Sequence, residues 1–270
     1  YTQGNELGAT VEDANGNKYT ETKNEYDGYY LTANGDKYTF AKQEKLCSDR
    51  ASAFVPLRYT ANMQYEGQAS GITTSEAWNE YYLDGYHGEL KSYKFSDKGR
   101  LGENGSGSFD YQTAIQYASN DAKHIFGLPV DVTVTSGGKT YHHVSAKYDM
   151  NYADHLTQIR QQLGGGEAVS DYVYDAYGNI TKTTLPANGK GQRMWYTYRY
   201  EPVMNMYVER IDDAFGYRSE ASNFDYRYGM ALRRMDLNHF YYETDIDNLG
   251  RIKAVRGPNE LATGVPYIIA

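Results

Sequence analysis

The chain contains very little cysteine, tryptophan and proline: of 270 residues, one is cysteine, two are tryptophan and six are proline. The single cysteine, Cys47, cannot form an internal disulfide or a thiolate metal cluster, and we interpret it as a half-buried structural thiol. No stretch approaches the roughly 18 apolar residues of a membrane-spanning helix. A basic surface is also missing, because the formal net charge is −8. This argues against a general nucleic-acid binder.

The ends of the sequence lack familiar signals. The chain begins at Tyr1, with neither an initiating methionine nor a signal peptide, and it ends on the apolar run 265–270. A folded domain rarely ends on an unsupported apolar strand. We therefore expect a piece of a longer polypeptide, in which missing targeting signals carry no information.

Tyrosine and glycine are abundant, with 30 and 27 residues against 8 phenylalanines. Tyrosine favours strands, and glycine favours the tight turns that join them. A tyrosine on a strand can bury its ring while its hydroxyl stays in water. The composition therefore predicts many strands in a thin wall that is wet on both sides.

One recurring pattern is an Asn-Gly turn. The sequence ANGNKYT at residues 14–20 returns as ANGDKYT at residues 33–39, and Asn-Gly occurs again at residues 104–105 and 188–189. Asn-Gly is a strong hairpin signal because both positions tolerate a positive φ. These segments predict β-hairpins, and the surrounding Gly/Ser stretch 102–108 predicts a loop.

A second pattern has the form Asp-x-(Tyr/Phe/Leu)-Gly. It occurs as DAYGNI at residues 175–180, DAFGY at 213–217 and DNLGRI at 247–252, with a looser relative, DKGRL, at 97–101. The Asp carboxylate can accept a hydrogen bond from the backbone N–H two residues on, and the Gly supplies a positive φ without steric cost. We expect the residue between them to pack back on the ribbon.

Between these turns the sequence alternates with the period of a strand. In WYTYRY at residues 195–200, Tyr196, Tyr198 and Tyr200 would share one face. Residues 156–163 fit either a helix or a strand, and we prefer a strand because both neighbours are strands.

Residues 75–82 leave a helical alternative open, because Ser75 could serve as the N-cap of a short helix.

The segment YVYDAYGNITK at residues 172–182 resembles the repeat unit of the RHS/YD-repeat family. The copy that begins at Asp247 keeps the family form Gly-Arg-Ile but has Ile246 where a tyrosine-rich strand is usual. The copy that begins at Asp213 has Tyr217 in place of Asn or Arg. The sequence GLP at 127–129 also resembles the family's entry into a strand. The resemblance covers residues 120–260 well and the first hundred residues weakly.

This resemblance implies an all-β fold, in which a continuous antiparallel strip of β-hairpins forms part of a hollow shell or curved sheet. Residues 1–120 would be divergent hairpin repeats, and residues 121–270 clearer repeats, without a firm boundary. The residues expected to have structural roles in the turns are Asp175, Tyr177, Gly178, Asn179, Asp213, Phe215, Gly216, Asp247, Gly250 and Arg251.

The resemblance also implies a function. Family members include shell-forming B and C components of bacterial Tc toxins, polymorphic toxins and the barrel of animal teneurins. The expected function is therefore encapsulation and delivery of a C-terminal toxic polypeptide by a secreted or cell-surface bacterial protein. Its partners would be the rest of the same polypeptide and other toxin subunits. The Asp-Pro motif that marks self-cleavage in the toxins does not occur in this sequence, so no catalytic residue is assigned.

For the other candidate sites, a structural role explains the residues better than a functional one does. His142 and His143 are adjacent and would point to opposite faces of a strand, which argues against a chelating pair. The segment from Asp13 to Asn17 alternates oxygen ligands as a calcium loop does, but Lys18 stands where that loop needs Gly, so we prefer a hairpin turn. The glycine-rich stretches lack the Lys-Ser/Thr ending of phosphate loops. We expect no cofactor, no metal and no enzymatic activity.

The tyrosine rows leave two interpretations. Cross-strand packing within the strip is preferred. The alternative is a cell-surface adhesion or carbohydrate-binding module, for which Trp195 and Trp78 are the candidate stacking residues. A third hypothesis, a β-rich glycoside-processing enzyme, requires two carboxylates that face each other across a cleft.

Overall fold

The computed structural model describes residues 5–31, 37–39, 52–83, 88–99, 109–149 and 155–267. The second Asn-Gly turn, Cys47, the loop 102–108 and the last three residues lie outside these ranges. The described residues form an all-β protein, which confirms the expected fold class. They divide into two compact units, Tyr1–Ala146 with Gln161–Gly164, and Lys147–Arg160 with Gly165–Ala270.

The first unit is an antiparallel ladder in which each strand pairs with the next. In ladder order the strands are β1 (Gly8–Glu12), β2 (Lys18–Tyr26), β6 (Leu57–Gln64), β7 (Ile72–Tyr81), β8 (Leu90–Asp97), β9 (Phe109–Asn120), β10 (Ile125–Ser136) and β11 (Lys139–Asp149). Between β2 and β6 the chain makes a small sheet of β3 (Tyr29–Leu31), β4 (Lys37–Thr39) and β5 (Ser52–Phe54), in the order β4-β3-β5.

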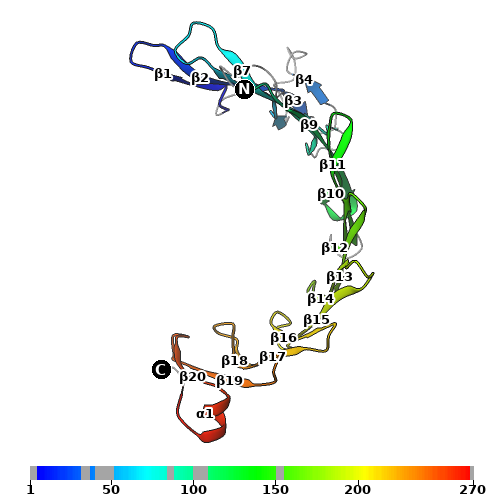
Figure 1. The fold of residues 1–270 in the computed structure, drawn as a ribbon, viewed down its shortest axis with the longest axis vertical. Helices are drawn as coiled ribbons and strands as arrows, with labels where there is room; N and C mark the ends of the chain where they lie inside the picture. The colour runs from blue at the N-terminus through cyan, green and yellow to red at the C-terminus, as the bar shows by residue number, and fades with distance from the viewer. Residues whose placement is uncertain are drawn as a thin grey trace. The chain divides into compact units, whose positions relative to one another are not determined.

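The second unit continues the same hairpin pattern, and consecutive strands from β13 to β20 pair antiparallel. The strands are β12 (His155–Leu163), β13 (Gly166–Tyr174), β14 (Ile180–Ala187), β15 (Arg193–Tyr200), β16 (Val208–Asp213), β17 (Arg218–Asp225), β18 (Met230–Met235), β19 (Tyr241–Ile246) and β20 (Ile252–Arg256). The last residues of β11, from Lys147, belong to this second unit, and the last residues of β12, from Gln161, belong to the first. One short helix, α1 (Pro258–Thr263), follows β20 and contacts β19 and β20 (Figure 1).

The pairing of strands shows whether each of the two ambiguous segments is a helix or a strand. Residues 156–163 are strand, as preferred from the sequence. The helical alternative for residues 75–82 is wrong, because β7 lies between β6 and β8 with Ser75 opposite both Asn62 and Asp97. A strand that is hydrogen-bonded on both sides satisfies all its backbone groups, whereas a helix there would break both ladders.

Burial is thin throughout the described residues. The apolar side chains that are buried there are Pro56, Ala61, Tyr65, Ala231, Met235 and Ala254. Single-layer ladders of this kind depend on cross-strand pairs and turn chemistry for their stability, because they have little core.

Candidate functional site

The turn at Asp175 shows the geometry behind the Asp-x-x-Gly pattern. One carboxylate oxygen of Asp175 accepts hydrogen bonds from the backbone N–H groups of Tyr177 and Asn179, both at 2.9 Å. The Gly178 N–H donates to the Asp175 carbonyl at 3.2 Å, and Gly178 has φ +88°. Partial burial raises the pKa of Asp175, but the N–H and amide donors outweigh it and the pKa is lowered.

The other two copies have the same geometry. Asp213 accepts from the N–H groups of Phe215 and Tyr217, both at 2.9 Å. Asp247 accepts from Leu249 at 2.8 Å and from Arg251 at 3.0 Å. The backbone and side chain of Arg251 both donate to Asp247 and lower the pKa of its carboxyl. In each turn the glycine has a positive φ and its N–H donates to the Asp carbonyl three residues earlier, the pattern of a three-residue hairpin loop with a glycine bulge.

The central side chain of each turn does not pack back on the ribbon as expected. Tyr177, Phe215 and Leu249 are exposed by 71%, 77% and 69%. The physical reason lies in the turn itself: the carboxylate binds two backbone N–H groups on the inner side of the loop, which leaves the side chain between them pointing to solvent. The turns therefore present apolar side chains to the surroundings.

Three further turns of this kind lie outside the Asp-x-(Tyr/Phe/Leu)-Gly pattern. Asp13 accepts from the N–H groups two and four residues on at 2.8 and 2.9 Å, which is a hairpin turn. The Asn188 side-chain oxygen accepts from the N–H groups of Lys190 and Gln192 at 2.9 and 3.0 Å. The glycine at positive φ in this turn is Gly191, not the Gly189 of the Asn-Gly pair. Asp236 accepts in the same way, with His239, at φ +64°, in the place of the glycine. In each of these turns the Asp or Asn stands five residues before the first residue of the next strand, and this spacing was the sequence signal that could have found them.

Tyrosine hydroxyls fasten the ends of neighbouring strands. Each of five tyrosines donates to a backbone carbonyl near the start of the preceding strand, at 2.9 to 3.1 Å. The pairs are Tyr26 to Glu6, Tyr81 to Leu57, Tyr117 to Leu90, Tyr174 to Leu156 and Tyr200 to Ile180. Burial raises the pKa of four of these hydroxyls, those of Tyr81, Tyr117, Tyr174 and Tyr200.

Glu201 was not anticipated from the sequence. Its side chain is 2% exposed and accepts hydrogen bonds from the backbone N–H groups of Val203 and Met204, at 2.8 and 2.9 Å, and from the Tyr226 hydroxyl at 3.1 Å. Burial would raise the pKa of Glu201, but these donors, with the N–H of Met206, lower it to about 2. The loop after β15 is therefore built around one ionised carboxylate.

Adjacent turns of the second unit are tied together along one edge of its ladder. The Asn179 amide donates to the Asn205 carbonyl at 2.7 Å, which joins the Asp175 turn to the Glu201 loop. The Tyr207 hydroxyl lies beside Gly229, where a Cβ would come within 2.9 Å of it. The Tyr228 hydroxyl donates to the carbonyl of Asn248 in the Asp247 turn.

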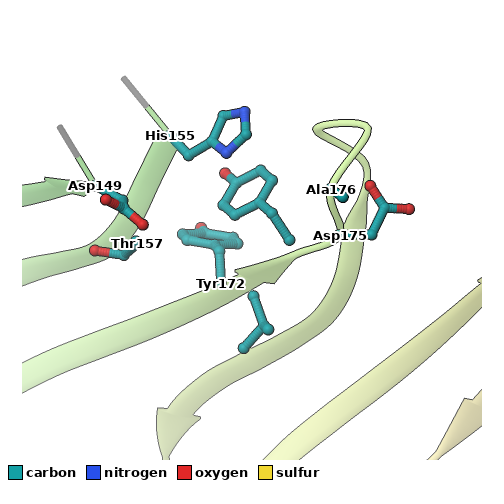
Figure 2. Close-up of a pocket in the computed structure, with 8 residues that line it drawn as sticks. Asp149, His155, Thr157, Tyr172, Asp175 and Ala176 are labelled. Carbon is teal, nitrogen blue, oxygen red and sulfur yellow. The ribbon is translucent and has the colours of Figure 1, made fainter. Parts of the chain in front are cut away.

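Next to the Asp175 turn is a pocket of about 400 Å³. The ring of His155 stacks on the ring of Tyr174, with centroids 4.4 Å apart and planes 17° apart. Figure 2 shows Asp149 on the strand side of the pocket and Asp175 on the turn side, with Tyr172 between them. The Asp175 carboxylate is already bound within its turn, and the rings of His155, Tyr172 and Tyr174 share the pocket wall with Asp149, Thr157, Val173 and Ala176.

The two tryptophans lie in separate units, each beneath a lysine. The Lys94 ammonium is 5.3 Å from the Trp78 ring centroid, and Tyr59 packs against the same ring at 5.5 Å. The Lys182 ammonium is 5.5 Å from the Trp195 ring centroid. Cation–π contacts of this kind occupy ring surface that a sugar would need. Whether either ring stacks on a glycan stays a prediction.

Arginine and carboxylate side chains form a network across the second unit. Asp212 accepts hydrogen bonds from Arg210 at 2.6 Å and from Arg218 at 2.8 Å. Both arginines lower the pKa of the Asp212 carboxyl, and the hydrogen bond from Arg210 has the larger effect. Arg256 pairs with Asp245 at 2.7 Å. These pairs are partly exposed, so each contributes modestly to stability. The Arg218–Asp212 and Arg256–Asp245 pairs join neighbouring strands and so favour the observed register, whereas Arg210 and Asp212 lie on the same strand.

The described histidines and carboxylates gather in no group of three or more that could hold a metal ion. His143 instead bonds within its sheet, with Nε2 2.7 Å from an Asp131 carboxylate oxygen and Nδ1 3.1 Å from the Gln162 side-chain oxygen. Across the described residues, no helix has the length and apolar character needed to span a membrane.

Taken together, the hairpin ladders, Asx turns and tyrosine bonds define an all-β strip of antiparallel hairpins. Crystal structures of TcdB2–TccC3–Cdc42, of TcdB2–TccC3 without its hypervariable C-terminal region, and of TcdB2–TccC3 have a similar fold, with TM-scores of 0.62, 0.62 and 0.61. Sequence identity is 12%, and each match covers 93% of this chain but 16% of the chain it matches. No protein-family model and no curated protein matches the sequence.

Proposed function

We propose that this chain is a wall segment of a shell that encloses a polypeptide. The observation that carries the proposal is the repeated hairpin with an Asp-capped turn and a tyrosine bonded to the preceding strand, in a chain whose fold is similar to segments of TcdB2–TccC3. The residues Tyr174 and Asp175 are the pair that gives the sequence its resemblance to YD repeats.

The thinness of the ladder supports this role. Few side chains of the described residues are buried, which supports a partition as the role of the strip. Exposed apolar side chains on the turns, such as Phe215 and Leu249, lie at the edges where further windings of a wall would cover them. In this proposal the residues carry out no chemistry and need no cofactor.

The proposal extends to partners and location by analogy with the family. The enclosed partner would be a C-terminal segment of the same polypeptide, and the outer partners would be other toxin subunits, of which TcdB2 and TccC3 are examples by fold. A shell that delivers such a segment acts outside the cell that makes it, so we propose a secreted or cell-surface protein.

Limited proteolysis of the full-length parent with a tag on its downstream segment tests the proposal. We expect the tag to resist cleavage until mild denaturant opens the wall. The downstream segment expressed alone is the control and should be cut at once. If the tag in the intact parent is cut as fast as in this control, the strip encloses nothing and the proposal is wrong.

A further inference from the structure

A row of polar side chains crosses four strands of the first unit. Thr22, Asn62, Ser75 and Asp97 are opposite one another on β2, β6, β7 and β8. The Thr22 hydroxyl donates to the Asn62 side-chain oxygen at 2.9 Å, and the Asn62 amide donates to the Ser75 hydroxyl at 3.0 Å. This polar row spans three strand spacings, about 14 Å.

The bonds within the polar row fix the direction of its donors and acceptors. Because Thr22 donates to the Asn62 oxygen, the Asn62 amide nitrogen faces Ser75. Asp97 is held by the Gly99 N–H, which donates to one carboxylate oxygen at 3.0 Å. A preorganised set of polar groups loses little entropy when a ligand binds.

A β-bulge shapes the surface beside the row. The register of β6 and β7 shifts between Asn62 and Met63, and the extra residue is Thr74. Its hydroxyl donates to the Asn62 carbonyl at 3.1 Å. Bulges re-aim side chains next to binding sites. Here the bulge lies within a groove of about 490 Å³ that the polar row lines.

One wall of the groove is aromatic. Phe95 lines it and stacks on Tyr111, with ring centroids 5.3 Å apart and planes 29° apart. Phe95 is two residues from Asp97 on β8, and therefore on the same face of the sheet as the polar row. The groove thus offers a ring surface beside a line of hydroxyl and amide groups.

These features select one class of ligand. The described residues that line the groove include Asp97, on the face of the polar row, and Glu21, whose carboxylate is bound by Lys18 and Tyr65, but no lysine, arginine or histidine, which disfavours phosphates and acidic polymers. Strands β2, β6, β7 and β8 are each paired on both sides, so a peptide cannot add to them as a further strand. A purely apolar ligand would leave the polar row desolvated and unpaired.

We propose that this groove binds a neutral oligosaccharide, whose hydroxyls would pair with the polar row while a sugar face packs on Phe95. The proposal goes beyond the wall function and does not depend on it. It also places the contact away from both tryptophans, because Trp78 lies on the opposite face of β7 from Ser75.

Calorimetric titration of the full chain with cellohexaose, maltohexaose and chitohexaose tests the proposal, with an oligogalacturonate as the anionic comparison. We expect millimolar or tighter binding of a neutral hexasaccharide. Loss of one partner from a preorganised set should weaken it about tenfold. The variants Asn62→Ala and Phe95→Ala test the two halves of the groove, and Ser75→Ala is a milder change if either of them fails to fold.

The controls are Gln112→Ala, which removes an amide from the opposite face of β9, and Trp78→Ala. Both should bind as the unaltered chain does. The proposal is overturned if no neutral hexasaccharide binds, if only the oligogalacturonate binds, or if affinity falls in the controls and not in the groove variants. The proteolysis of the tagged parent is independent, so either proposal can fail alone.

Discussion

Gly250 and Gly216 occupy the same place in two turns of one kind, with φ +80° and +86°. Their surroundings differ: a Cβ on Gly250 would lie 2.6 Å from a Tyr228 ring carbon, whereas a Cβ on Gly216 would meet nothing within 4 Å. Gly216→Ala should therefore cost about 1–2 kcal/mol, from the left-handed backbone alone. Gly250→Ala should cost about 1–3 kcal/mol more, from the clash.

Urea unfolding of the two variants measures this difference, and each serves as the control for the other. Equal losses of stability would show that the Tyr228 ring moves aside without cost. That result would contradict our inference that the hydrogen bond from Tyr228 to Asn248 holds the ring against the Asp247 turn.

Glu201 predicts a pH dependence. Its pKa falls from an ordinary 4.5 to about 2 on folding, so the ionised form stabilises the fold. That contribution is fully present above about pH 4.5 and is lost as pH falls towards 2. Glu201→Gln should be less stable than the unaltered chain at pH 7, and the two should converge in acid.

Urea midpoints between pH 7 and pH 2 measure this convergence. Glu167→Gln is a suitable control, because Glu167 is an exposed partner of Arg160. A gap between Glu201→Gln and the unaltered chain that stays constant down to pH 2 would show that the carboxylate charge does not hold the loop.

The limits of sequence reasoning are clearest for single residues. The carboxylate roles of Asp175, Asp213 and Asp247 follow from spacing, because an Asx turn is a local interaction. Glu201 was not found this way: its backbone donors Val203 and Met204 are local, but the Tyr226 hydroxyl that completes the set is 25 residues away in sequence. The outward direction of Tyr177 was also missed, because strand alternation does not extend into a turn.

At the scale of the element, the Asn188 turn shows that an amide oxygen can replace the Asp carboxylate. Asp213→Asn should therefore change stability little. Asp213→Ala should cost about 1 kcal/mol, because it leaves the N–H groups of Phe215 and Tyr217 to water. Thermal unfolding of both variants provides the measurement, and an equal loss for Asn and Ala would exclude the hydrogen bonds as the source of the turn's stability.

Elements were predictable where the pattern was local. The strand at residues 156–163 and the hairpins at Asp13 and Asn188 were expected. The turn at Asp236 was missed because His239 takes the left-handed position that glycine usually fills. The sequence alone could not exclude a helix at residues 75–82. Only the pairing of β7 with β6 and β8, which is a tertiary interaction, excludes it.

At the scale of the whole molecule, each strand of the described ladders contacts its neighbours, as in other repeat proteins. Stability should then be a sum of local and nearest-neighbour contributions. Gly250→Ala should speed amide hydrogen exchange in β17 to β20 and leave β6 to β8 unchanged. A uniform loss of protection along the chain would mean that both units unfold as one.

The fold class was predictable because the same hairpin signals recur along the chain. The grouping of the described residues into two compact units was not, since no change of composition marks Ala146 or Arg160. Nor was the polar row of the first unit, whose members come from four strands and whose alignment depends on register.

The five tyrosine bonds to carbonyls near strand starts share one direction along the chain, whereas Tyr82 and Tyr228 bond forward, to Ile115 and Asn248. Tyr26, Tyr81, Tyr117, Tyr174 and Tyr200 each bond to a carbonyl that precedes them in the sequence. When one of these strands leaves the ribosome or an export channel, the carbonyl group that fixes its register has therefore already been synthesised. The register of such a strip can be fixed one hairpin at a time as the chain emerges, before a later segment is present to pair with the same strand edge.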